Sequence, residues 1–378
     1  MTNRERAMGV LNYGNYDRMP VVHFGFWRET LEKWRAEGHI DADIMDYYAD
    51  GNEYDAAITK LLGFDFNWQP AITLNTSISP LFPVETVKVL DNGKKHVRGA
   101  EGVTVLVDER IGDTIHCEID HLLKDRESWE EHYKPRLQYS KKRVSRSALE
   151  GYPARVSEIG MDGPRGIAVG SLFGYIRNWM GFEGVSLLYY EDEELYGEII
   201  ETLSDLVYET AKESMGILKS VGFTLDYAHF WEDICFKNGP LVKPAVFDSM
   251  VGPHYGRITD MLKTFGVGIV SLDCDGVIDM LVPTWVENGV NTMFPIEVGT
   301  WGADIAPWRE KYGRELRGVG GMNKNVFALD KAAIDAEIER LKPLIALGGY
   351  IPCPDHRLPP GAKWDLVRYY ADSMRELR

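Results

Sequence analysis

Cysteine is scarce in this sequence, and long apolar runs are missing. Only four cysteines stand among 378 residues, scattered and without a Cys-x-x-Cys pair, which excludes a disulfide framework and a structural zinc ribbon. No stretch approaches the roughly 20 apolar residues of a membrane helix. The charged opening (1–20) lacks the apolar core of a signal peptide. We therefore expect a soluble, cytoplasmic protein.

Basic residues are also in short supply. Lys and Arg total 42 against 58 Asp and Glu, which gives a formal net charge of −16. Nucleic acids and anionic membranes attract proteins through basic surfaces, so we expect neither as a partner. The sequence also lacks a Gly-x-Gly-x-x-Gly turn after an early strand, which argues against an open dinucleotide-binding sheet.

What the sequence does contain is a repeated alternation of short apolar segments with helical ones. Each apolar segment has the length and composition of a buried parallel strand. Strands of this kind are expected at 19–27, 63–68, 165–173, 223–231, 267–274, 290–298, 315–323 and 350–356. Eight such units predict an α/β protein with a (β/α)8 TIM barrel, contained in a single domain over residues 1–378.

One segment breaks this alternation. Residues 84–119 alternate apolar and polar side chains around Asp91-Asn92-Gly93, a pattern typical of antiparallel hairpins. We expect an insertion over about 75–135, between the second and third barrel strands, that caps the barrel.

Polar side chains collect at the predicted strand ends. In a TIM barrel the carboxyl ends of the strands and the loops that follow them form the active site. The acidic and imidazole side chains expected there are His23, His229, Glu232, Asp233, Asp273, Asp275, Glu297, Asp355 and His356. So many acids need positive charge close by, either from Lys237, Lys324 and Arg357 or from a bound cation.

Some of these residues form a candidate metal site. Asp273, Asp275, Glu297 and His356 supply oxygen and nitrogen ligands that suit zinc with an open position, or a harder divalent ion. Both carboxylates of an Asp-x-Asp pair point to the same side of an extended chain. Cys353 is an alternative ligand. For each acid, the alternative role is a helix N-cap or a loop salt bridge.

The aromatic residues near the strand ends suggest an apolar slot for a substrate. The predicted substrate contacts are Trp27, Tyr175 and Trp231, with His23, His229 and Cys353 beside them. Packing in the protein core is the alternative role for each of these side chains.

The chain resembles the uroporphyrinogen decarboxylase-like superfamily. The segments that carry the resemblance are "RERAMGVLNYGNYDRMPV" (4–21), "DCDGVIDMLVPTWVENGVNTMFPIEV" (273–298), "YGRELRGVGGMNKNVFA" (312–328) and "GGYIPCPDHRLPP" (348–360). They span nearly the whole chain, and the resemblance implies a (β/α)8 barrel. Decarboxylases of this superfamily carry an "RQAGR"-type segment that grips the acid groups of the tetrapyrrole. Here the corresponding stretch, "VVHFGFWRETLEKW" (21–34), has only Arg28, and the acidic rim is a poor match for a polyanionic substrate.

The resemblance therefore points to the superfamily's other branch, the cobamide-dependent methyltransferases. Members that act on coenzyme M bind zinc through a His-x-Cys pair and a later Cys, positions that correspond here to Asp273, Asp275 and His356. A carboxylate and imidazole set leaves a metal more electrophilic, which suits an oxygen-bound methyl group. The resemblance implies an O-demethylase type of methyltransferase, which moves a methyl group from a small methoxylated, aromatic donor to a corrinoid carried by a partner protein.

In this interpretation the metal polarises the ether oxygen, and Glu232 or Asp233 protonates or steers the departing phenolate. The predicted catalytic residues are Glu232, Asp233 and Lys237. Alternatives are a decarboxylase of a small acid, a metal-independent glycoside hydrolase that uses Glu232 and Glu297, and a non-catalytic ligand-binding relative. The oligomeric state is left open, with a homodimer among the options.

Overall fold

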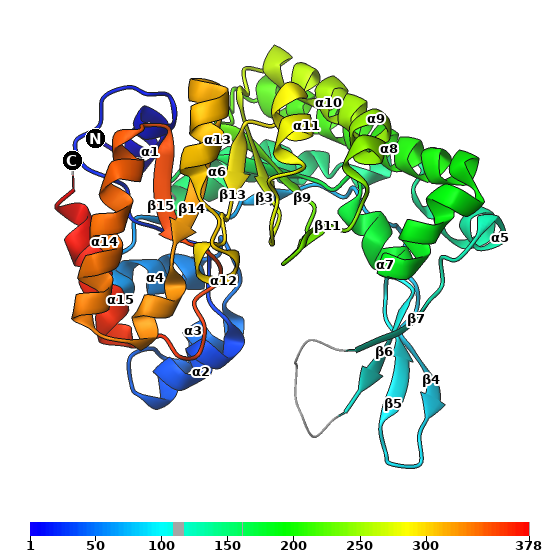
Figure 1. The fold of residues 1–378 in the computed structure, drawn as a ribbon, viewed down its shortest axis with the longest axis horizontal. Coiled ribbons are helices and arrows are strands. Elements are labelled where there is room, and N and C mark those ends of the chain that lie inside the picture. Colours follow the sequence, from blue (N-terminus) through cyan, green and yellow to red (C-terminus); the bar gives the residue numbers. More distant parts are fainter. Residues whose placement is uncertain (109–116, 161, 378) are drawn as a thin grey trace.

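The computed structural model describes residues 1–108, 117–160 and 162–377, and its main feature is a large parallel sheet (Figure 1). Seven strands form this sheet, in the order β15-β14-β13-β12-β9-β8-β3, and every neighbouring pair is parallel. Their bounds are β3 (Ile72–Thr73), β8 (Gly166–Gly170), β9 (Tyr227–Trp231), β12 (Ile269–Asp273), β13 (Thr292–Phe294), β14 (Arg317–Met322) and β15 (Tyr350–Pro354). The α/β class with a large parallel sheet is confirmed.

A separate parallel pair, β1 (Val22–His23) and β2 (Phe66–Asn67), precedes the strands of this sheet in the chain, and β1 contacts the edge strand β15. β2 and β3 follow one another closely, with β2 pairing to β1 and β3 pairing to β8. Pro70 lies between them, and because proline has no N–H it cannot continue a ladder of hydrogen bonds.

The other edge approaches β1 through an isolated parallel bridge between Phe26 and Leu358. There Trp27 N donates to Leu358 O at 3.2 Å, and Leu358 N donates to Gly25 O at 3.1 Å. The described strands therefore do not form one closed, hydrogen-bonded barrel. The arrangement is consistent with a TIM-barrel-like fold, and each of the eight predicted strand segments contains part of an observed strand.

Helices surround the sheet, because each carries an apolar face. In α15, for example, Trp364, Val367, Tyr370, Ala371 and Met374 are buried at the three- and four-residue spacing of one helix face. The longer helices are α1 (Asn3–Leu11), α2 (Arg28–Ala36), α4 (Glu53–Leu62), α6 (Arg146–Ile159), α7 (Gly174–Glu191), α8 (Glu193–Ser220), α10 (Gly252–Thr264), α13 (Ile305–Tyr312), α14 (Lys331–Ala346) and α15 (Trp364–Arg375). Shorter ones are α3 (Ala42–Tyr47), α5 (Arg126–Ser128), α9 (Pro244–Met250), α11 (Val282–Glu287) and α12 (Val298–Trp301).

The segment that breaks the strand–helix alternation contains a four-stranded antiparallel sheet in the order β4-β5-β6-β7. Its strands are β4 (Glu85–Val89), β5 (Lys95–Arg98), β6 (Val103–Val107) and β7 (Cys117–His121). In Figure 1 this sheet projects from the main body beside α7. Asn92 accepts from the Lys94 N–H at 3.1 Å in the first turn, where Gly93 has a φ of +82°. Residues 109–116 of the predicted hairpin segment lie outside the described residues.

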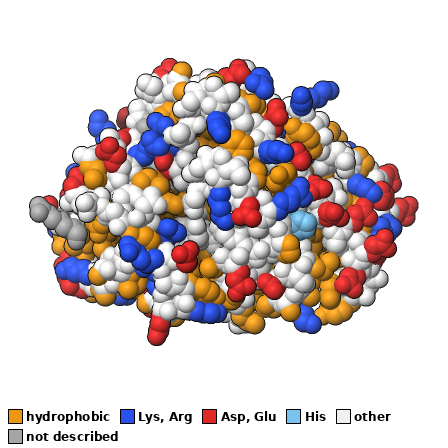
Figure 2. Space-filling model, turned by 90° about the horizontal axis from the view of Figure 1, so that it is seen from above, with side chains coloured by type: hydrophobic (Ala, Val, Ile, Leu, Met, Phe, Trp, Pro, Cys, Tyr) orange, Lys and Arg blue, Asp and Glu red, His pale blue; other side chains and the backbone are white. Residues whose placement is uncertain are grey.

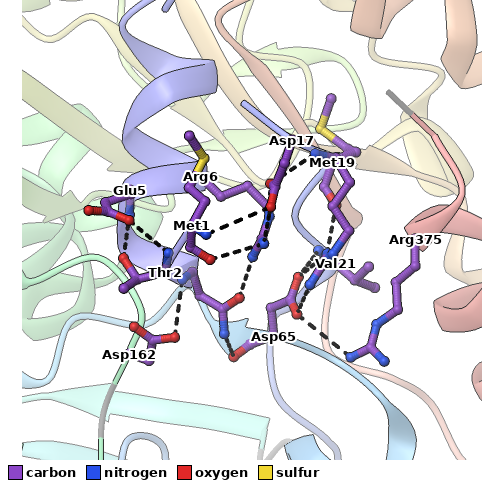
Figure 3. A network of polar contacts seen from close by, with 12 residues as sticks. Met1, Thr2, Glu5, Arg6, Asp17, Met19, Val21, Asp65, Asp162 and Arg375 are labelled. Atoms are coloured by element: carbon purple, nitrogen blue, oxygen red, sulfur yellow. Dashed lines mark hydrogen bonds and ion pairs between the residues drawn. The ribbon is translucent and has the colours of Figure 1, made fainter. Parts of the chain in front are cut away.

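A network of polar contacts ties the chain ends to the amino ends of the first strands (Figure 3). The Asp65 carboxylate accepts two hydrogen bonds of 2.7 Å from Arg18 and one of 2.9 Å from the Val21 N–H. Arg375, near the C-terminus, lies 3.6 Å from the same carboxylate. Because these contacts lie at the amino ends of β1 and β2, they hold the end of the fold that is opposite to the predicted active site.

The described surface mixes both signs of charge. On the face drawn in Figure 2, basic and acidic side chains are interspersed with apolar ones, and acidic side chains gather toward the right-hand end. None of the helices in the described ranges has the length and apolarity required to span a membrane.

Candidate functional site

A cavity of about 460 Å³ lies at the carboxyl ends of β8, β9, β12 and β15. Eight of the residues predicted at strand ends line it. They are Trp27, Tyr175, His229, Trp231, Asp233, Asp273, Asp275 and His356. No residue of β13 or β14 lines it, so the cavity occupies one side of the sheet's carboxyl end rather than its centre.

The register between β9 and β12 sets which residues of these two strands lie side by side in the cavity wall. β9 and β12 are parallel neighbours, with His229 opposite Ser271 and Trp231 opposite Asp273. Alternate residues of a strand face the same side, so both members of each strand point inward. His229 Nδ1 lies 3.2 Å from Ser271 Oγ, and burial lowers the pKa of His229 to about 3, so its imidazole is neutral at pH 7.

Asp273 is the most enclosed acid of the cavity. Asp273 is 8% exposed. Its carboxylate accepts no hydrogen bond and forms no ion pair with a lysine or arginine of the described residues. Burial raises the pKa of Asp273 well above its usual value, and the charges of Asp275 and Asp233 add to that effect.

Asp275 connects the end of β12 to the end of β15. Its Oδ2 lies 3.5 Å from His356 Nε2, while its Oδ1 is buried without a hydrogen-bond partner among the described residues. The His356 ring in turn stacks on Trp27, with ring centroids 5.6 Å apart and planes 13° apart. Trp27 is 37% exposed, which places it at the mouth of the cavity.

Asp233 has an arginine partner, unlike Asp273 and Asp275. Arg177 of α7 donates to Asp233 Oδ2 at 2.8 Å and to the Asp233 carbonyl at 2.6 Å. The backbone of Asp233 is in the left-handed region, with a φ of +42°, and this turn directs the chain away from the end of β9. Burial raises the pKa of Asp233, and Arg177 opposes the effect.

The other basic residues near the cavity are bound to different acids. Lys324 Nζ lies 3.4 Å from Asp355 Oδ1, and Arg357 forms an ion pair with Asp50. Lys237, a predicted catalytic residue, is exposed at the turn between β10 (Cys235–Phe236) and β11 (Gly239–Pro240) and does not line the cavity.

Glu232, another predicted catalytic residue, does not line the cavity either. Its side chain is fully buried, and its carboxylate accepts from the N–H groups of Leu172, Phe173 and Gly174, from Ser171 Oγ and from the Tyr255 hydroxyl. Tyr255 belongs to α10, whereas the other donors belong to the first turn of α7 and the loop before it, where a carboxylate is favoured by the unpaired N–H groups. A Cβ at Gly174 would lie 2.0 Å from the Glu232 carbonyl oxygen, so only glycine allows this close approach.

Three further predicted residues are buried elsewhere. Glu297 Oε2 accepts from the Gly276 N–H at 2.8 Å, and Cys353 is fully buried within β15. His23 accepts from the Gly25 N–H through Nδ1 at 3.0 Å, so its Nε2 carries the proton toward Thr59 Oγ1 at 2.7 Å. None of the three lines the cavity.

Of the predicted metal ligands, Asp275 and His356 lie close together in this arrangement. Across the residues that the structure describes, no three or more His, Cys, Asp or Glu side chains are grouped so that they could hold one ion. Glu297 is engaged by the Gly276 backbone and lies outside the cavity, which leaves Asp275 and His356 as the close pair. Zinc stays a prediction, and no step proposed below passes through a metal.

Sequence reasoning missed Phe24, which lines the cavity, whereas Arg357, named as a possible partner of the rim acids, lines it as well. Phe24 packs edge-on against His356, with ring centroids 5.4 Å apart. The choice of His23 instead rested on its polarity. Since neighbouring residues of a strand face opposite sides, the placement of Phe24 in the cavity turns His23 away from it.

Comparison with known proteins gives a fold likeness. No protein-family model and no curated protein matches the chain. Among solved structures, a methyltransferase from Methanosarcina mazei is 13% identical, the match covers 100% of this chain and 99% of the other, and the TM-score is 0.62. A B12-independent methionine synthase from Shewanella sp. W3-18-1 is 12% identical over 95% of this chain and 98% of the other, with a TM-score of 0.49. At these identities, the likeness to the Methanosarcina protein shows a shared fold.

Proposed function

We propose that this chain is a methyltransferase of the uroporphyrinogen decarboxylase-like superfamily, and that its methyl donor binds in the 460 Å³ cavity. The observation that carries the proposal is the composition of that cavity, where aromatic side chains and carboxylates meet at the ends of parallel strands. Its volume lies in the range of sites for small molecules. The four sequence segments that resemble the superfamily support the proposal, as does the fold shared with a protein described as a methyltransferase.

The acceptor in this proposal is a corrinoid carried by a separate protein. The methyl carbon leaves its donor atom, which keeps the bonding electron pair, and bonds to the cobalt(I) centre, which supplies an electron pair and becomes cobalt(III). For a methoxylated aromatic donor, the departing oxygen also takes up a proton. Asp233 is the acid that we assign to this step, because it lines the cavity and its pKa is raised by burial.

Glu232 has a positioning role in the proposal. Its carboxylate fixes the start of α7, and Tyr175 of the first turn of α7 lines the cavity. The glycoside hydrolase alternative required Glu232 and Glu297 to flank a sugar. The cavity does not favour this alternative, because neither Glu232 nor Glu297 lines it.

The test is an anaerobic methyl-transfer assay. Purified chain is mixed with cob(I)alamin and a donor panel of methoxyarenes, methyl thioethers and methylated ammonium ions, and methylcob(III)alamin is followed by its absorbance. We expect product with at least one donor class, at a rate that depends on the chain and falls about tenfold or more in Trp231→Ala, since loss of an aromatic wall misplaces the donor. An absence of methyl transfer from every class would contradict the proposal.

A further inference from the structure

We propose that the cavity recognises a methylated ammonium cation, such as a quaternary ammonium head group, through its unpaired carboxylates and its aromatic walls. The binding follows from the cavity alone. The inference rests on the proposed function only for the fate of the methyl group.

The first argument concerns uncompensated negative charge. Asp273 is 8% exposed, faces the cavity, and has no hydrogen-bond donor or basic partner among the described residues. Beside it, Asp275 Oδ1 is also buried without a donor in the part of the chain that the structure describes. Ionising a buried carboxyl group without a partner is costly, which is why the pKa of Asp273 is raised, and a cation that enters the cavity offsets this cost and favours the ionised form.

The second argument is that nearby basic groups are engaged elsewhere. Arg177 is bound to Asp233, Lys324 to Asp355 and Arg357 to Asp50. His229 is neutral at pH 7, because burial lowers its pKa to about 3. Among the described residues, His356 lies 3.5 Å from Asp275, and the charge of Arg357, which lines the cavity while paired with Asp50, partly opposes the raised pKa of Asp273. The cavity therefore offers negative potential to a ligand.

The third argument is the aromatic wall. Trp231 and Tyr175 lie with ring centroids 6.0 Å apart on the β8 and β9 side. Trp27 lies on the β15 side, stacked on His356, with Phe24 at the edge of the same imidazole. Faces of tryptophan and tyrosine attract methylated ammonium ions, whose charge is spread over the methyl groups. Trp231 is also the register partner of Asp273, and both line the cavity, so an aromatic side chain and a carboxyl group stand side by side.

The fourth argument separates an organic cation from a metal ion. A metal ion requires three or more donor atoms at close and fixed distances. None of the described residues form such a group. A methylated ammonium ion needs no directed ligands, only negative potential and apolar contact, and a 460 Å³ cavity accommodates it.

The chemistry of transfer agrees with this donor class. When a methyl carbon leaves a quaternary nitrogen for cobalt(I), the C–N bond breaks and its electron pair stays on nitrogen, which becomes a neutral tertiary amine. No proton and no Lewis acid is needed to stabilise this leaving group. Methyl transfer from such a donor therefore fits a cavity whose acids are not arranged around a metal.

The experiment compares choline with its uncharged isostere 3,3-dimethylbutan-1-ol by isothermal titration calorimetry, using the full chain at pH 7.5 and low ionic strength. We expect choline to bind about tenfold or more tightly than the isostere, as cation–π contact and one unscreened carboxylate would give. Asp273→Asn should weaken choline binding about tenfold and leave the binding of the isostere unchanged. Asp260→Asn on α10, an exposed acid with Lys263 as partner, is the matched control and should bind choline as the wild type does.

Several outcomes would overturn the inference. Equal binding of choline and the isostere, or no choline binding at millimolar concentrations, would remove the role of charge. A zinc titration that shows one tightly bound ion, lost in Asp273→Asn and blocking choline, would assign the carboxylates to a metal instead. Should Asp273→Asn not fold, Asp275→Asn replaces it. Demethylation of methoxyarenes without choline binding would defeat this inference and keep the proposed function, while choline binding without methyl transfer from any donor would do the reverse.

Discussion

At the scale of single residues, the proposed role of Asp273 predicts that its carboxyl group lowers the stability of the ligand-free chain. A buried carboxyl group without a partner costs free energy, whereas an amide of the same shape carries no charge. We expect Asp273→Asn to raise the free energy of unfolding of the ligand-free chain by about 1–2 kcal/mol at pH 7, as for other strained functional sites. Urea denaturation measures it, with Asp260→Asn expected to stay within about 0.5 kcal/mol of the wild type. A loss of stability in Asp273→Asn would mean that its carboxylate has a stabilising partner.

His23 makes a second residue-scale prediction, on the pH dependence of stability. Burial lowers its pKa from 6.5 to about 3, so the folded state holds the neutral imidazole while the unfolded chain takes up a proton below pH 6.5. The stability that His23 contributes is complete above pH 6.5 and falls by about 1.4 kcal/mol per pH unit as the pH drops toward 3. In His23→Gln, the slope of unfolding free energy against pH between 6 and 4 should be shallower by about that amount. An unchanged slope would contradict the burial of a neutral His23.

His23 also shows the limit of predicting site residues from the sequence. The order of strands and acids located the carboxyl ends of β9 and β12, and hence Trp231, Asp233, Asp273 and Asp275, which do line the cavity. It could not decide between His23 and Phe24. Strand β1 is two residues long, so too few alternations exist to fix which side faces inward.

At the scale of elements, the contact between Glu232 and α7 gives a test of its role. Glu232 follows β9 and accepts hydrogen bonds from the start of α7. In Glu232→Gln one of those donors meets an amide N–H instead of an acceptor, so we expect a loss of about 2–4 kcal/mol in the free energy of unfolding. Choline binding at 10 °C should survive in the folded fraction. Wild-type stability combined with complete loss of methyl transfer would instead support the catalytic role predicted from the sequence.

The strands themselves show why the parallel sheet was predictable and its closure was not. β9, β12 and β15 are five residues each, apolar and fully or almost fully buried, so composition alone identifies them. The second predicted strand segment instead continues as two short strands, β2 and β3, on either side of residues 68–71. The sequence shows Pro70, which predicts an interruption of the strand. It does not show that the chain then pairs with β8, because that pairing depends on residues distant along the chain.

At the scale of the whole molecule, the two ends of the sheet differ in how their acidic side chains are paired. At the carboxyl ends, two acids that line the cavity, Asp273 and Asp275, have carboxylate oxygens without a hydrogen-bond donor among the described residues, although Glu232 and Asp233 nearby are paired. The amino ends gather acids with several partners, as Asp65 illustrates with Arg18 and Arg375. Acids without a partner therefore lie beside the cavity in which we propose that a ligand binds, whereas Asp65 at the opposite end is fully paired.

This division predicts independent effects of substitutions at the two ends. Asp65→Asn leaves Arg18 and Arg375 without their carboxylate in a largely buried setting, and we expect it to lower the free energy of unfolding by about 2–4 kcal/mol. Choline affinity, measured well below the unfolding temperature, should not change. Since the sites share no contacts, the double variant Asp65→Asn/Asp273→Asn should show the sum of the single stability changes within about 0.5 kcal/mol. A larger deviation, or a shift in choline affinity with Asp65→Asn, would show that the two ends of the strands are energetically coupled.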